Sequence, residues 1–285
     1  MCRFITTFAN GLGYTGRHLV HLKEGTYGAP HSAEVDPGQD KLVATSPAPK
    51  QLMGIEDNVL SSLMHIGGTD LAESIPESPQ RMRRLMHDIT MLGTSLPEGI
   101  WVRHGLGRID MMKILIAGPV GTPYEYGLFE FDLFCTASYP TKPPVMEFRT
   151  TGNGEVAFNP NLYADGKVCL SLLGTWTGES WGPASTLLQL FVSIQAMILC
   201  EQPYYNEPTR KGVSKRRSDE YNEAVRNWTA QFAIAGWLGR PNPSPIWQDV
   251  VDYHFKKHAV DIINISEHWW YSEKEEALRL VKAKA

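Results

Sequence analysis

Hydrophobic residues recur at two spacings along the chain, and the change between them predicts the order of the elements. Ser78 and Pro79 are typical of a helix start. Apolar residues at three- and four-residue steps then predict an amphipathic helix that ends near Leu96. Four runs typical of strands follow, at 100–106, 111–117, 128–134 and 145–149. Because the turns between them are too short for parallel pairing, we expect an antiparallel meander.

Helical patterns return in the last third of the chain. Apolar positions between 187 and 198 surround most of a helix circumference, which predicts a buried helix. Two further helices are predicted near 218–235 and 246–270. One helix, a meander and then helices is an α+β pattern. We therefore expect three parts: a weakly structured region and linker at 1–75, a core at 76–212, and a helical C-terminal extension at 213–285.

Charge and hydropathy narrow the choice of partners. The 285 residues carry 27 Lys and Arg against 31 Asp and Glu, a formal net charge of −4, so we expect neither nucleic acid nor a membrane as partner. No apolar run approaches the roughly 18–20 residues that span a bilayer. The N-terminal residues lack the apolar segment of a secretory signal. We expect the cytosol or the nucleus.

The cysteines raise the question of metal binding. Cys2, Cys135, Cys169 and Cys200 form no C-x-x-C pair, which argues against a zinc site. His18 and His21 have no further ligand at a matching spacing, so we expect solvated loop histidines and no metal. Cys135 and Cys200 end apolar patterns and are predicted to be small buried hydrophobic residues.

Cys169 differs from the other cysteines in its surroundings. It follows the turn at Gly166 and precedes Leu170, a placement expected to expose the thiol while apolar neighbours anchor the loop. Asn161, eight residues upstream, has a side-chain amide that suits donation to an oxyanion or bracing of the loop. No histidine lies nearby in sequence to act as a base, which argues against a papain-like protease.

A series of ordered motifs resembles the catalytic core of ubiquitin-conjugating enzymes, over roughly residues 78–208. In chain order they are Gly118-Pro119, Thr122-Pro123-Tyr124, Tyr139-Pro140, Pro143-Pro144, Asn159-Pro160-Asn161, Cys169 and Trp181-Gly182-Pro183-Ala184. The stretch EQPYYNEP at 201–208 and the tail to about residue 270 extend the similarity. They resemble the branch of the giant inhibitor-of-apoptosis conjugating enzyme (BRUCE-like) and the large hybrid conjugating enzyme–ligase.

The resemblance implies the ubiquitin-conjugating (UBC) fold and acyl transfer without a cofactor. Cys169 would accept ubiquitin as a thioester from a ubiquitin-activating enzyme and pass it to a lysine of a protein substrate. Asn161 takes the oxyanion or bracing role. Asn206 and Glu207 fall near a polar or acidic gate for the incoming lysine, with a solvated loop as the alternative. A non-catalytic ubiquitin-binding scaffold and conjugation of a ubiquitin-like modifier stay open.

Three features depart from the family pattern. Asn159 replaces a histidine whose family role is mainly structural, so activity is still expected. Thr141 replaces an aromatic residue that often docks ligases, which leaves open whether a ligase is a partner. The loop after the cysteine is longer and carries Trp176, which we assign, with Tyr163 and Trp181, to packing and loop support. We hypothesise that the extension holds substrate or charged ubiquitin in place of a standard ligase.

Overall fold

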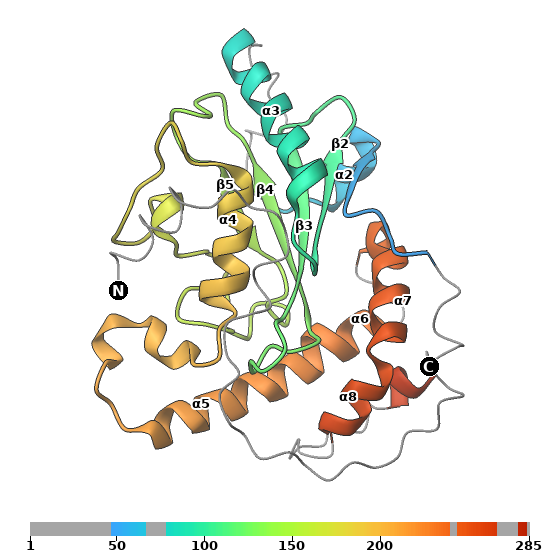
Figure 1. The fold of residues 1–285 in the computed structure, drawn as a ribbon, viewed down its shortest axis with the longest axis vertical. Coiled ribbons are helices and arrows are strands. Elements are labelled where there is room, and N and C mark those ends of the chain that lie inside the picture. The colour runs from blue at the N-terminus through green and yellow to red at the C-terminus, as the bar shows by residue number, and fades with distance from the viewer. Residues whose placement is uncertain (1–46, 67–77, 240–243, 267–278, 284–285) are drawn as a thin grey trace. The chain divides into compact units, whose positions relative to one another are not determined.

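A mixed sheet with helices around it forms the part of the chain that the structure, a computed structural model, describes: residues 47–66, 78–239, 244–266 and 279–283 (Figure 1). Its strands are β1 (Leu52–Ile55), β2 (Ile100–Gly105), β3 (Met111–Ala117), β4 (Leu128–Phe134) and β5 (Val145–Phe148). Its α-helices are α2 (Asp57–Leu63), α3 (Pro79–Ser95), α4 (Leu187–Ser193), α5 (Lys215–Trp228), α6 (Gly236–Leu238), α7 (Gln248–Lys257) and α8 (Ala259–Ser266). Short 3-10 helices are η3 (Ser171–Leu173), η5 (Pro203–Asn206), η6 (Pro208–Arg210) and η8 (Pro245–Trp247), and π-helical segments are η4 (Ile194–Ile198) and η7 (Thr229–Ala235).

The predicted meander is confirmed, because β2, β3, β4 and β5 pair antiparallel in chain order. The predicted number of strands was wrong. β1 adds a fifth strand, which runs parallel to β2 with Leu52 opposite Val102. The side chain of Gln51 secures it by donating to the carbonyls of Pro97 and Ile100 at 2.7 and 3.1 Å. A four-residue strand has too little alternation to be recognised, and this one depends on a partner about fifty positions away.

The predicted helices are also confirmed. α3 begins after Ser78 and ends before Leu96, as expected. The buried helix at 187–198 consists of α4 and the π-helical turn η4. In the extension, α5, η7 and α6 form one helical line beneath the strands in Figure 1. α7 and α8 follow, and residues 267–270 of the last predicted helix lie outside the described residues.

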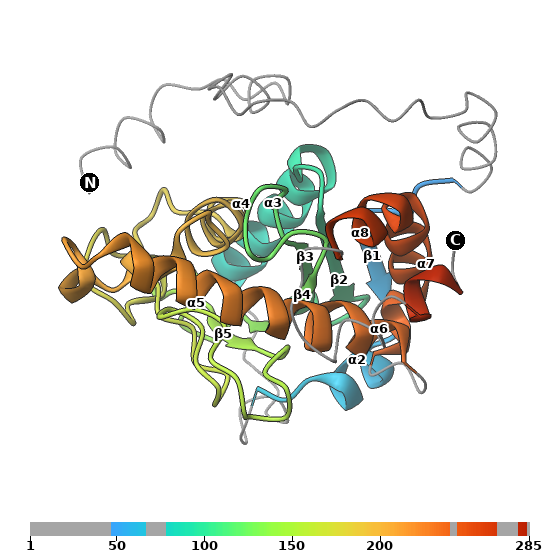
Figure 2. The ribbon, with the colours of Figure 1, turned by 90° about the horizontal axis from the view of Figure 1, so that it is seen from below.

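Alternate residues of the strands point into two separate cores, so both faces of the sheet are buried. On one face, Ile114 and Phe131 pack with Leu85 of α3 and Leu190 of α4. On the other face, strand residues such as Leu115 pack with the apolar residues of the extension. Figure 2 shows α4 at one side of the molecule and α7 and α8 at the other. The extension is therefore part of the same folded unit as the sheet.

Polar contacts also join the extension to the sheet. Arg103 of β2 is fully buried, and its guanidinium donates to both carboxylate oxygens of Asp249 at 3.1 and 2.9 Å. The same guanidinium lies 4.8 Å from the ring centroid of Trp247. The Trp237 indole donates to the carbonyl of Leu128 at 2.8 Å. These contacts fix the position of the extension against β2 and β4.

The described residues from Ala48 onward belong to one compact unit. The three-part division at residues 75 and 212 stays a prediction, because 1–46 and 67–75, with Cys2, His18 and His21, lie outside the described residues. No helix in the described ranges is long and apolar enough to cross a membrane.

Candidate active site

A tight turn returns the chain so that Cys169 lies against Asn161. The amide of Tyr163 donates to the carbonyl of Lys167 at 3.0 Å, and Gly166 donates back to Tyr163 at 3.1 Å. Gly166 has φ +90°, and a Cβ there would meet the Phe148 carbonyl at 3.0 Å. Only glycine suits this position, because both its backbone conformation and the close neighbour exclude a side chain. The amide of Cys169 then donates to the carbonyl of Asn161 at 2.8 Å.

Apolar neighbours anchor this turn to the sheet, as the sequence predicted. Val168, Leu170 and Leu173 are all buried in the core under α3 and α4. The hydroxyl of Thr175 accepts from the amide of Leu170 at 2.9 Å and donates to the carbonyl of Val168 at 2.7 Å. Cys169 itself is only 2% exposed. The expected exposure of its thiol is therefore absent from this conformation.

The side chain of Asn161 braces the loop in this structure. Its Nδ2 donates to the carbonyl of Cys169 at 2.7 Å, and its backbone amide donates to Oδ1 of Asn159 at 2.9 Å. Of the two roles considered for Asn161, the observed contacts are those of a loop brace. The amide nevertheless holds the backbone of the residue that carries the thiol.

Asn159 links three segments through one amide. Its Nδ2 donates to the hydroxyl of Tyr124 at 2.9 Å and to the carbonyl of Ile198 at 2.8 Å. Its Oδ1 accepts from Asn161 and, at 3.3 Å, from Nδ2 of Asn206. With four partners, the amide can replace a histidine as a structural hydrogen-bonding residue.

The two predicted gate residues are placed differently. Asn206 turns toward the protein, where its Nδ2 also donates to the carbonyl of Met197 at 3.2 Å. Glu207, the next residue, is half-buried. The pKa of Tyr163 is raised, first by its interaction with Cys169, then by burial, and further by the charges of Glu207 and Asp165. Of the two gate residues, Asn206 therefore has its amide occupied by Asn159 and Met197, which is a structural role.

Tyr163 is the site residue that sequence reasoning assigned to packing. Its side chain is 39% exposed, and Cys169 is the main cause of the rise in its pKa. The signal available in the sequence was its place in the turn between Asn161 and Gly166. That place alone did not tell on which side of the turn the ring lies.

The other described cysteines are poorer nucleophiles. Cys135 is fully buried, and burial, with the charges of Asp88 and Asp110, raises the pKa of its thiol well above the usual value. Burial also raises the pKa of Cys200, whose thiol lies 3.6 Å from Oδ1 of Asn206. Because the thiolate is the reactive form, both shifts reduce reactivity at neutral pH. The described residues contain no group of three or more metal-ligating side chains.

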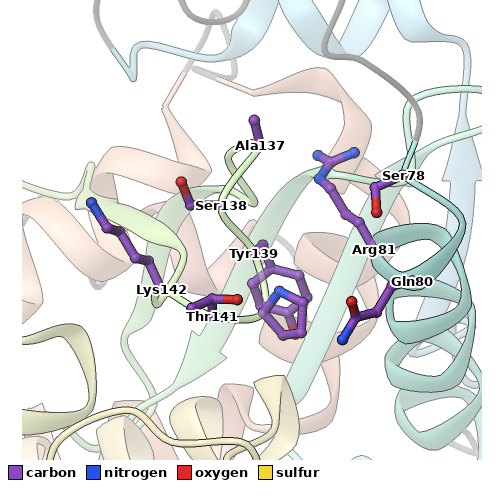
Figure 3. Close-up of a pocket in the computed structure, with 9 residues that line it drawn as sticks. Ser78, Gln80, Arg81, Ala137, Ser138, Tyr139, Thr141 and Lys142 are labelled. Carbon is purple, nitrogen blue, oxygen red and sulfur yellow. The ribbon is translucent and has the colours of Figure 1, made fainter.

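A hollow separate from the cysteine turn lies at the start of α3. The side chain of Trp181 donates to the carbonyl of Pro140 at 2.8 Å, which brings the Trp181 loop against the turn after β4. Beside this contact is a hollow of about 300 Å³ lined largely by polar side chains. Figure 3 shows Thr141 and Lys142 on one side of the hollow and Gln80, from α3, on the other. None of its lining residues belongs to the cysteine turn.

Comparison with known proteins identifies the class that this fold and thiol define. Residues 84–231, more than half of the chain, match the family described as ubiquitin-conjugating enzyme. The chain belongs to the ubiquitin-conjugating enzyme family.

Curated relatives show which members of this family the chain is similar to. It is 42% identical over 207 residues to the human dual E2 ubiquitin-conjugating enzyme/E3 ubiquitin-protein ligase BIRC6, covering 67% of this chain and 4% of that protein. It is 40% identical over 206 residues to probable ubiquitin-conjugating enzyme protein 17 of Caenorhabditis elegans, covering 68% of this chain and 28% of that protein. It is 42% identical over 174 residues to human ubiquitin-conjugating enzyme E2 Z, covering 59% and 48%. The predicted resemblance to the BIRC6-like branch is confirmed, and the chain spans less than half the length of each of these relatives.

Proposed function

We propose that this chain is a ubiquitin-conjugating enzyme that carries ubiquitin as a thioester on Cys169. The observation that carries the proposal is the anchored turn, in which Cys169 is held against Asn161, eight residues upstream, by two hydrogen bonds of 2.8 and 2.7 Å. The family match and the names of the relatives support ubiquitin as the modifier. Partners would be ubiquitin, a ubiquitin-activating enzyme and protein substrates, with a ligase left open.

The first step is transthioesterification. The Cys169 thiolate attacks the carbonyl carbon of the thioester that joins ubiquitin's C-terminal glycine to the activating enzyme, and that enzyme's cysteine leaves as thiolate. No additional energy source is needed, since one thioester replaces another. Because Cys169 is 2% exposed, the side chains around the thiol must move when the donor thioester approaches.

The second step forms an amide. The amine of a substrate lysine attacks the new thioester, the Cys169 thiolate leaves, and the proton lost by the amine goes to solvent or a nearby base. We assign the holding of the lysine to the Glu207 carboxylate and the Tyr163 hydroxyl, because Tyr163 lies on the cysteine turn and Glu207 follows Asn206, which contacts Asn159. Asn161 stabilises the loop by donating a hydrogen bond to the Cys169 carbonyl.

The test is a charging assay. The full chain is incubated with ubiquitin-activating enzyme, ATP and ubiquitin, and the products are run on non-reducing and reducing gels. We expect an adduct of one ubiquitin that reductant removes. Parallel reactions with ubiquitin-like modifiers and their activating enzymes separate the alternative conjugation reactions. Ubiquitin binding without any adduct would instead support the non-catalytic scaffold.

A further inference from the structure

The segment that leads from the catalytic region into α5 carries a concentrated positive charge. Arg210, Lys211, Lys215, Arg216 and Arg217, which we call the basic patch, are five of eight consecutive residues, and the segment contains no acidic residue. The chain as a whole has more acidic than basic residues. Arg210 is half-buried and the other four residues are exposed. The patch is therefore a local feature that the net charge conceals.

Three of these charges destabilise the helix in which they lie. Lys215, Arg216 and Arg217 form the first turn of α5, where the helix dipole favours acidic side chains and none is present. Arg216 pairs with Glu220 at 3.1 Å, yet its side chain stays 80% exposed. Lys215 and Arg217 make no ion pair with any residue that the structure describes. Cations that destabilise their own helix indicate a partner outside it.

The patch begins next to the proposed lysine entrance. The backbone amide of Arg210 donates to the carbonyl of Glu207 at 3.0 Å, within the single turn η6. Asn206, the residue before Glu207, donates to Oδ1 of Asn159 at 3.3 Å, and the same oxygen accepts from the backbone amide of Asn161 on the cysteine turn. The guanidinium of Arg210 lies 4.8 Å from the ring centroid of Tyr204, which holds this end of the patch in place.

We propose that the basic patch binds an acidic segment of the substrate polypeptide next to the acceptor lysine. The proposal rests on the proposed function and specifies its substrate class: lysines flanked by Asp and Glu. A polypeptide fits better than a single-stranded nucleic acid, because Arg210 already covers the nearby rings of Tyr204 and Tyr221 on which bases would stack. An exposed ion pair is worth about a 1.4- to 5-fold change in affinity, so several together give roughly tenfold at low salt.

The test compares a patch variant with a matched control in the full chain. The patch variant is Lys215→Glu with Arg217→Glu, and the control is Lys50→Glu with Lys282→Glu. All four residues are exposed, and both variants change the net charge equally. Glutamates in the first turn of α5 suit the helix dipole, so the patch variant should melt no lower than the control. The probes are two labelled peptides with one lysine, flanked by glutamates or by serines.

Peptide binding to the uncharged chain, measured by fluorescence anisotropy, needs no ubiquitin and tests the patch even if charging fails. At low salt, we expect the parent and the control to bind the glutamate peptide about tenfold more tightly than the serine peptide. The patch variant should bind both peptides with the same affinity. Single-turnover discharge onto the peptide lysine should show the same preference, while discharge onto free lysine stays equal in all three proteins.

Equal binding of both peptides by the parent would overturn the proposal, and so would an undiminished preference in the patch variant. Patch-dependent binding of a single-stranded oligonucleotide without any preference between the peptides would also overturn it. Absence of the thioester in the parent would count against the proposed function and leave the binding result to decide on the patch.

Discussion

At the scale of single residues, the thiol environments separate Cys169 from its alternatives. Burial raises the pKa of Cys135 and Cys200, whereas Cys169 lies on a turn beside the partly exposed Tyr163. We predict that Cys169→Ser converts the reductant-sensitive adduct into a reductant-resistant ester, because a serine oxygen replaces the sulfur. Non-reducing and reducing gels of the charging reaction measure this. Cys200→Ser is the control and should still form a thioester; a reducible adduct on Cys169→Ser would contradict the assignment.

Asn161 is a second test at this scale. Its amide donates to the Cys169 carbonyl and is 8% exposed, so Asn161→Ala leaves a buried carbonyl without its donor. Such a loss costs about 1–3 kcal/mol. We predict a free energy of unfolding lower by that amount in urea titrations, and similar slowing of charging and of transfer to lysine. Transfer slowed by roughly 10²–10³, with charging and stability unchanged, would indicate the oxyanion role instead.

The sequence predicted those parts of the site that depend on local spacing. Cys169, Asn161 and the anchoring Leu170 fall within one short turn, so their arrangement follows from the chain itself. The orientation of Asn206, the burial of the Cys169 thiol and the place of Tyr163 were not predictable. Each depends on side chains that meet only when distant segments pack.

At the scale of elements, long periodic segments were predicted well. The meander and α3 carry enough alternation or helical repeat to identify them without a partner. β1 and α2 contain only four and seven residues and depend on contacts with β2 and β3. The row of buried charges on one sheet face also could not be predicted from the sequence. There Lys113 pairs with Asp132 and, at 3.3 Å, with Glu130, an arrangement that only strand register creates.

α7 carries a residue that should make stability depend on pH. His254 is 4% exposed and its Nε2 lies 3.0 Å from the Tyr126 carbonyl; burial, and then the charge of His258, lower its pKa to about 3. An unfolded histidine has a pKa of about 6.5. Between these values the unfolded chain binds a proton that the folded chain does not, so the free energy of unfolding falls as the pH falls.

We predict that His254 alone lowers the free energy of unfolding by about 2 kcal/mol between pH 7 and pH 5. The half-buried His258, whose pKa burial also lowers, adds to the fall in the same direction. His254→Gln keeps an N–H donor for the Tyr126 carbonyl and does not titrate. Urea unfolding at both pH values should show a fall smaller by about 2 kcal/mol in this variant. An identical fall in both proteins would mean that His254 protonates without cost to the fold.

At the scale of the whole molecule, the extension completes the fold and is not an appendage to it. Its buried apolar residues cover the face of the sheet opposite α3 and α4, and Arg103 and Trp237 tie it to the strands. The hypothesis that the extension holds substrate or charged ubiquitin therefore cannot be tested by deleting it. Surface substitutions that leave the core intact, such as those in the basic patch, are the suitable test.

We predict that a chain ending at residue 212 does not fold cooperatively. The deletion removes Trp237, Trp247, Val250, Phe255 and Ile262, all buried against the sheet or one another. Each contributes about 1.5–3 kcal/mol, and together they approach or exceed the 5–15 kcal/mol by which a whole domain is stable. The deletion also leaves the Arg103 charge without its carboxylate partner in a strand whose other face is buried.

Thermal melting followed by circular dichroism, with binding of a hydrophobic dye, measures the effect of this deletion. We expect no sharp transition and strong dye binding for residues 1–212. The control is a chain that begins at residue 47 and keeps the extension; it retains the compact unit and should melt cooperatively and accept ubiquitin at the rate of the full chain. If residues 1–212 melt sharply and charge at that same rate, the extension is dispensable for folding, and deletion again becomes a valid test of its role in transfer.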